Sequence, residues 1–274
     1  MLDWEEVAKA ELHVHLFGAI QSAVLLELAR RNRVHLPVDT IAGLHEGFRF
    51  RDFDHFSEVL RTLRPCVQTA EDLELITYEA GRDLAAQHVR YAEVMVTPMG
   101  LELRGIRFPA SLETMNRARA RVRADFGLEL RWIFDFNRSV PDEAECRYWA
   151  DYATEVAIAG RDGGVVALGL SGAEDGNPPE QFAPWFERAR AAGLHSVPHA
   201  GEHGGPDSVW GAINALGAGS SLTACARSKI RRWWPTWRGI GSPLTSARRA
   251  TSDSACTIRG LRTRYPGCIG RACR

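Results

Sequence analysis

The stretch LHSVPHAGEHGGP, residues 194–206, combines a short apolar run, a glycine-rich turn and the expected start of a helix. His199 ends the predicted strand, and Glu202 follows three residues later. An imidazole nitrogen can bind a divalent metal, and a carboxylic acid can act as general acid or base. Such residues at the exit of a strand predict a βα unit whose chemistry lies at the C-terminal end of the strand.

The same alternation of strand and helix extends upstream through the first four-fifths of the chain. We predict strands at 10–16, 89–98, 128–137, 165–170 and 194–199. We predict helices at 22–32, 53–64, 70–86, 111–126, 141–160, 179–193 and 207–216. The pattern predicts an α/β fold, namely an incomplete (β/α)8 TIM-type barrel of about five units. No G-x-G-x-x-G follows the first strand, which argues against a dinucleotide-binding fold.

Composition indicates a soluble globular protein. Apolar residues make up 45% of the chain and charged residues 25%. The N-terminus lacks the pattern of a signal peptide, and no apolar stretch approaches the roughly 18 residues of a membrane span. We therefore expect a cytoplasmic protein without membrane partners.

The net charge of zero conceals a sharp change near residue 219. Residues 220–274 contain eleven arginines and one lysine against a single acid, Asp253. Because the whole chain is neutral, residues 1–219 carry an equal excess of acidic residues. We expect residues 1–219 to form the barrel portion and residues 220–274 to be a poorly ordered basic tail without a domain of its own.

His13 and His15 flank Val14 on the first predicted strand. Side chains at positions i and i+2 of a strand point to one face, so both imidazoles can reach the same metal ion. A pair with this spacing is more often two half-buried core histidines. The third histidine at the end of another strand, His199, favours the metal-binding interpretation.

Glu202 and Gly172 are the other candidate site residues. A closed pocket would raise the pKa of the Glu202 carboxyl and suit it to acid–base catalysis, whereas a plain helix-start glutamate is the simpler alternative. Gly172, just after the fourth predicted strand, would allow a planar ligand to approach the backbone, although a turn is the commoner use of glycine.

Together these residues resemble the adenosine deaminase family of metal-dependent aminohydrolases. The resemblance rests on KAELHVHL at 9–16, LSGAE at 170–174 and VPHAGE at 197–202. It implies one Zn2+ held by His13, His15 and His199, a purine contact at the backbone of Gly172, and hydrolytic deamination of a 6-aminopurine nucleoside. Glu202 would protonate the purine ring while activated water attacks the carbon that bears the amine.

The resemblance leaves the substrate open. The alternative to adenosine is aminodeoxyfutalosine, which some bacterial members deaminate in menaquinone synthesis. A second alternative is the substrate of another kind of amidohydrolase. Phe17 stands where the family usually has an acid that helps hold the sugar. The oligomeric state is not indicated by the sequence.

The family's later Gly-His-Gly and Ser-Asp-Asp motifs are absent after residue 219. Assigning GC-rich codons to the tail and reading from one base earlier yields a histidine–glycine pair and a Cys-Pro-Thr-Ser-Asn stretch. We therefore predict that the tail is a frameshifted reading of a deaminase gene, which leaves the chain with weak metal binding and little activity. The competing interpretation is a non-catalytic chain whose arginine-rich tail binds nucleic acid.

Overall fold

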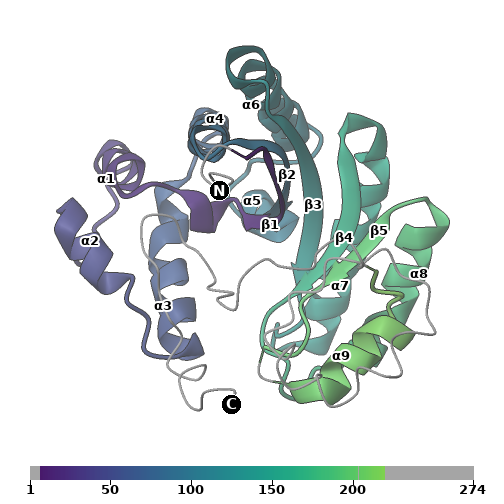
Figure 1. Ribbon diagram of the computed structural model, residues 1–274. Helices are drawn as coiled ribbons and strands as arrows, with labels where there is room; N and C mark the ends of the chain where they lie inside the picture. Colours follow the sequence, from purple (N-terminus) through teal and green to yellow (C-terminus); the bar gives the residue numbers. More distant parts are fainter. Residues whose placement is uncertain (1–6, 203, 220–274) are drawn as a thin grey trace, which may run out of the picture.

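The computed structural model describes residues 7–202 and 204–219, and it places five parallel strands in one curved sheet in the order β1-β2-β3-β4-β5 (Figure 1). The strands are β1 Lys9–His15, β2 Val89–Val96, β3 Glu129–Asn137, β4 Val165–Ser171 and β5 His195–Pro198. Sequential strands that pair in parallel and are joined by helices form the βα units of a TIM-type barrel. The prediction of an incomplete barrel with five units is thus confirmed. The predicted basic tail, 220–274, lies outside the described residues.

Several of the helices in the described part of the chain pack against the outer face of this sheet. The helices are α1 Ser22–Arg31, α2 Ile41–Gly47, α3 Phe53–Leu63, α4 Ala70–Ala86, α5 Pro98–Glu102, α6 Ala110–Phe126, α7 Glu143–Ala159, α8 Ala183–Ala191 and α9 Gly205–Asn214. Helix α4 contacts β2, α6 contacts β3, α7 contacts β3 and β4, and α8 contacts β4 and β5. The strands are largely buried between these helices and the inner face, which explains their nearly continuous apolar runs.

Alternation along the strands divides their side chains between two apolar clusters. Outward-facing residues such as Trp132, Phe134 and Leu168 join the main core beneath the helices. Inward-facing Met95 and Val197 belong to a smaller cluster on the concave face. Because this second face is narrow, its inner positions lie close to one another, and it is the face to which the predicted metal ligands belong.

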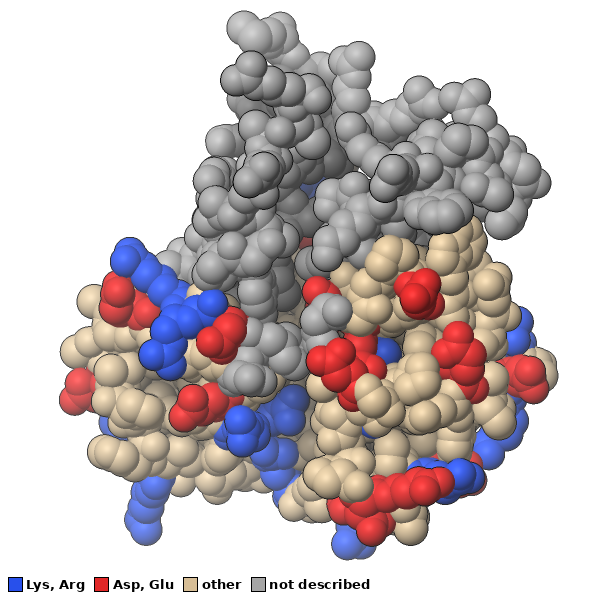
Figure 2. Space-filling view, turned by 90° about the horizontal axis from the view of Figure 1, so that it is seen from below, with Lys and Arg blue, Asp and Glu red and all other residues tan. Residues whose placement is uncertain are grey.

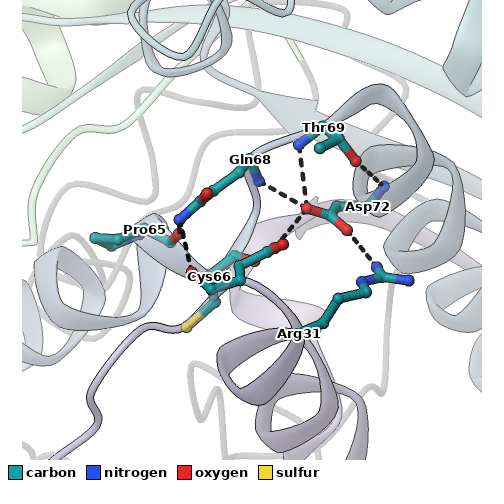
Figure 3. Close-up of polar contacts among 7 residues, drawn as sticks. Arg31, Pro65, Cys66, Gln68, Thr69 and Asp72 are labelled. Atoms are coloured by element: carbon teal, nitrogen blue, oxygen red, sulfur yellow. Dashed lines mark hydrogen bonds and ion pairs between the residues drawn. The ribbon is translucent and has the colours of Figure 1, made fainter.

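The start of α4 is fixed by a buried carboxylate, Asp72, which is 1% exposed (Figure 3). Thr69 caps the helix by accepting a hydrogen bond from the Asp72 backbone amide at 3.2 Å, while Asp72 Oδ2 accepts from the Thr69 amide at 3.1 Å. The same oxygen accepts from the Gln68 amide at 2.9 Å and from Asn32 Nδ2 at 2.6 Å. Arg31 forms an ion pair with Oδ1. Asp72 therefore ties α1 to α4.

Three helical segments differ from the sequence-based prediction. Helices α2 and α5 were not predicted, because each is too short to show helical periodicity. The predicted helix 179–193 is divided into a 3-10 turn, Pro179–Phe182, and α8. The other predicted elements agree with the structure to within about two residues, the usual uncertainty of an element boundary.

Acidic and basic side chains are interspersed on the described surface seen in Figure 2. Many of them form exposed pairs, such as Arg188 with Asp151 at 3.0 Å. Such pairs are screened by solvent and contribute little to stability, on the order of 0.5 kcal/mol each. Within residues 7–202 and 204–219, no helix combines the length and apolarity that crossing a bilayer requires.

A candidate metal centre at the strand ends

Three histidine side chains converge at the C-terminal edge of the sheet. The Nε2 atoms of His13 and His15 lie 3.2 Å apart, and each lies 3.1 Å from Nε2 of His199. His15 is paired with Met95 across β1 and β2, and His199 follows Val197 by two residues, so both face the concave side. The sheet thus brings together residues 186 positions apart in sequence. The cluster could hold a metal ion, since each residue offers one ligand atom.

Burial and mutual proximity favour the neutral form of two of these imidazoles, His13 and His15. The pKa of His13 lies well below its ordinary value because of burial and the neighbouring His199 and His15. Burial, followed by the charge of His199, lowers the pKa of His15 to about 4. A histidine binds a metal through its neutral form, and three imidazole nitrogens around one point suit the chemistry of Zn2+. The donor set therefore fits the metal that the sequence predicted.

Glu202 lies next to this cluster, on the turn between β5 and α9. Its Oε1 lies 3.3 Å from Nδ1 of His199, the ring nitrogen opposite the one that faces the other histidines. Burial raises the pKa of Glu202, but the hydrogen bond and charge of His199 outweigh it and hold the pKa below its ordinary value. The sequence-based expectation of a raised pKa therefore differs from the structure, because a positive or donor partner lies within reach of the carboxylate.

Gly172 directly follows β4 in the left-handed backbone region, with φ of +92°. A Cβ at this position would clash with Asn137 Oδ1 and lie 2.7 Å from Ser139 Oγ. The close approach of the β3 and β4 ends therefore accounts for this glycine. Its predicted contact with a purine remains a prediction.

Three buried polar residues near the site were not predicted from the sequence. Glu174 is 5% exposed, Arg138 is 0% exposed, and Asp135 is 1% exposed. Both carboxylate oxygens of Asp135 are buried without a hydrogen-bond partner among the described residues, and its charge acts on His15. Asp135 and Arg138 give no local signal, since an isolated Asp or Arg is most often exposed. Glu174 ends the LSGAE stretch at 170–174, but its residue type alone assigned it no role.

The structure thus brings His13, His15, His199 and Glu202 together and places Gly172 at the neighbouring strand end. His195, on the same strand as the approach to His199, is exposed at the start of β5 and is not part of the cluster. His203 lies outside the described residues. Phe17 packs against the main core from the short 3-10 turn Phe17–Ala19 after β1.

Residues 8–220 match the family model of adenosine deaminase. Aminodeoxyfutalosine deaminase of Streptomyces coelicolor is 44% identical over 214 residues, which cover 77% of this chain and 54% of the relative. Adenine deaminase of Bordetella avium is 35% identical over 217 residues, covering 79% of this chain and 67% of the relative. The chain thus spans little more than half the length of its Streptomyces relative.

Solved structures resemble the same region. Adenine deaminase from Arthrobacter aurescens superposes with a TM-score of 0.71 at 29% identity, covering 81% of this chain and 66% of that one. An amidohydrolase from Burkholderia ambifaria with bound Zn gives a TM-score of 0.75 at 26% identity, covering 87% and 65%. The sequence match, the half-barrel and the shared fold lead to one conclusion: the chain belongs to the adenosine deaminase family.

Proposed function

We propose that this chain derives from a Zn2+-dependent deaminase that replaces the exocyclic amine of a 6-aminopurine compound with oxygen. The observation that supports this best is the convergence of three Nε2 atoms at 3.1–3.2 Å from one another. We assign His13, His15 and His199 as the metal ligands. A bound Zn2+ supplies Lewis acidity and lowers the pKa of water, which makes hydrolysis possible at neutral pH.

Glu202 is the proposed proton donor to the purine ring. It lies beside the imidazole cluster, and its side chain is 23% exposed, so a ligand can reach it. Hydrolytic deamination adds water to the carbon that bears the amine and expels ammonia. A carboxyl group that delivers a proton to the adjacent ring nitrogen makes that carbon more electrophilic. The backbone of Gly172 is the proposed purine contact, because no side chain intervenes there.

For the substrate, aminodeoxyfutalosine has the strongest support, since the Streptomyces relatives with that activity in their names are 44% identical. Adenine is the second candidate, on the basis of the 35% identical Bordetella relatives. Adenosine, our first expectation from the sequence, ranks below both. Phe17 in place of the usual acid agrees with a substrate whose sugar is held differently.

The test compares the 274-residue chain with a version whose codons after 219 are translated in the corrected frame. Each is loaded with Zn2+ and given aminodeoxyfutalosine, adenine and adenosine, and released ammonia is measured. We expect deamination of aminodeoxyfutalosine by the corrected version, little activity from the 274-residue chain, and a loss of about 100-fold or more in Glu202→Gln. Robust adenosine turnover by the 274-residue chain, or a fully active Glu202→Gln variant, would contradict the proposal.

A further inference from the structure

Glu174 receives two backbone hydrogen bonds from the turn that carries Glu202. Its Oε2 accepts from the Gly201 amide at 2.9 Å, and its Oε1 accepts from the Glu202 amide at 2.7 Å. The two oxygens of this carboxylate therefore accept hydrogen bonds from two consecutive amides, and Glu174 lies 27 positions before the first of them in the chain. Hydrogen bonds to an ionised carboxylate are roughly twice as strong as neutral ones. This pair of bonds fixes the orientation of the peptide that precedes the Glu202 side chain.

The position of Glu174 is itself closely defined. The loop after β4 is held by Ser139, whose Oγ accepts from the Ala173 amide at 3.2 Å, and by Asn177, whose backbone amide donates to the Glu174 carbonyl at 3.0 Å. On the other side, Gly204 lies so near that a Cβ there would clash with Glu174 Oε2. The carboxylate is therefore enclosed between two loops and has little room for another rotamer.

Arg138 holds the residue on the other side of this turn. Its guanidinium donates through Nη2 to the carbonyl oxygen of His199, from a residue 61 positions earlier. Burial lowers the pKa of Arg138 to about 10, so the group stays charged at neutral pH. Its positive charge acts on the carboxylates of Glu174 and Glu202. The His199–Glu202 segment is thus hydrogen-bonded by two buried side chains. Arg138 follows β3, and Glu174 lies in the loop after β4.

We propose that Glu174 is a positioning residue for Glu202, with Arg138 as its counterpart at His199. This inference rests on the proposed function in assigning His199 to the metal and Glu202 to proton transfer. Glu202 Oε1 lies 3.3 Å from Nδ1 of His199, and a carboxylate at that nitrogen orients a metal-binding imidazole and increases its basicity. Glu174 would therefore set both the direction of the proton donor and the strength of the metal site, without touching either metal or substrate.

The first test measures amide hydrogen exchange in the full 274-residue chain. Glu174→Ala should accelerate exchange at Gly201 and Glu202 by about tenfold or more, because both amides lose a charged acceptor. Amides within β4 should keep their rates, and Glu187→Ala, at an exposed position on α8, serves as the matched control. Unchanged exchange at Gly201 and Glu202, or equally accelerated exchange throughout the sheet, would overturn the proposal.

The second test uses Co2+ as the metal probe and measures its affinity from the visible absorption bands. Loss of a residue that orients the metal ligands, without binding the metal itself, typically weakens a metal site by 10- to 100-fold. Glu174→Ala should therefore weaken Co2+ binding by about tenfold, but it should add little in a Glu202→Ala background, because its effect passes through Glu202. Gly204→Ala, which retains both carboxylates but crowds Glu174, should reproduce the weakening.

Additive effects of Glu174→Ala and Glu202→Ala would show that Glu174 acts on the fold alone, and this would overturn the positioning role. If the unsubstituted chain binds no Co2+, the proposed metal centre fails. Amide exchange at Gly201 and Glu202 then still decides whether Glu174 orders the turn. The two failures are thus distinguishable.

Discussion

At the scale of single residues, the imidazole cluster resists protonation in the folded protein, which keeps its nitrogens available to a metal ion but lowers stability in acid. His15 is buried beside the rings of His13 and His199, so a proton on its own ring loses solvation and is repelled by His199. The unfolded chain has no such restriction. The pKa of His15 therefore falls from about 6.5 in the unfolded chain to about 4 in the folded protein.

This difference predicts that the metal-free protein loses stability in mild acid. Between pH values of about 6.5 and 4, the unfolded chain binds a proton at His15 and the folded chain does not, so the free energy of unfolding falls as pH falls. The contribution is on the order of 3 kcal/mol across that range. Urea unfolding with a chelator at about pH 7, 5.5 and 4.5 measures it.

His15→Gln should make this dependence shallower, although His13 still contributes to it, whereas His195→Gln, at an exposed position, should leave it unchanged. An equally steep loss of stability in His15→Gln would show that other groups are responsible for the acid sensitivity.

At the scale of elements, the buried carboxylate at the start of α4 joins the N-terminal helices to the barrel. Burial raises the pKa of Asp72, but hydrogen bonds from Gln68, Asn32 and Thr69 outweigh it, and the pKa lies below its usual range. The Arg31 charge acts in the same direction. Because one side chain satisfies donors from α1 and from the α4 cap, its loss affects two helices at once (Figure 3).

Asp72→Ala should therefore lower the free energy of unfolding by about 3 kcal/mol, since it leaves buried donors and the Arg31 charge without their acceptor. Chemical denaturation followed by circular dichroism gives this value. Glu71→Ala, at the exposed neighbouring position in the same helical turn, should cost much less. A similar loss of unfolding free energy in the two variants would show that Asp72 stabilises the helix start only as any acidic residue there does.

At the scale of the whole molecule, the described sheet is open rather than closed. β1 pairs with β2 and β5 pairs with β4, and within residues 7–202 and 204–219 neither edge strand has a second partner. The family match ends at residue 220, next to the change in composition near 219. We propose that the coding frame changes there, because reading the tail from one base earlier, with GC-rich codons assigned to it, yields stretches that resemble motifs of the family in their order.

The nucleotide sequence around codon 219 tests this proposal. We expect that one base gained or lost near that codon separates the present frame from one that continues the deaminase motifs. An uninterrupted reading frame that encodes the arginine-rich residues in independent isolates would contradict it. The tail would then be examined as a nucleic-acid-binding segment, by filter binding at increasing salt with and without residues 220–274.

Much of the fold and the candidate ligand set could be predicted because the relevant signals are local. Strand and helix periodicities identify the five units, and the alternation of side chains places His13 and His15 on one face. The short helices α2 and α5 could not be predicted, since five to seven residues carry too little periodicity and depend on packing. The predicted direction of the Glu202 pKa shift was wrong. The turn places the Glu202 carboxylate beside His199, which lowers this pKa, and the sequence alone does not show that contact.

The sequence by itself determined the kinds of element, their order and the histidines and glutamate available for chemistry, since these follow from local pattern and residue type. Only the tertiary structure decided that three Nε2 atoms meet, and that Glu174 and Arg138 hold the turn between His199 and Glu202. The contacts that His199 and its turn make with other elements join residues 27 to 186 positions apart. Their geometry depends on strand register and on the curvature of the sheet, which no short stretch of sequence encodes.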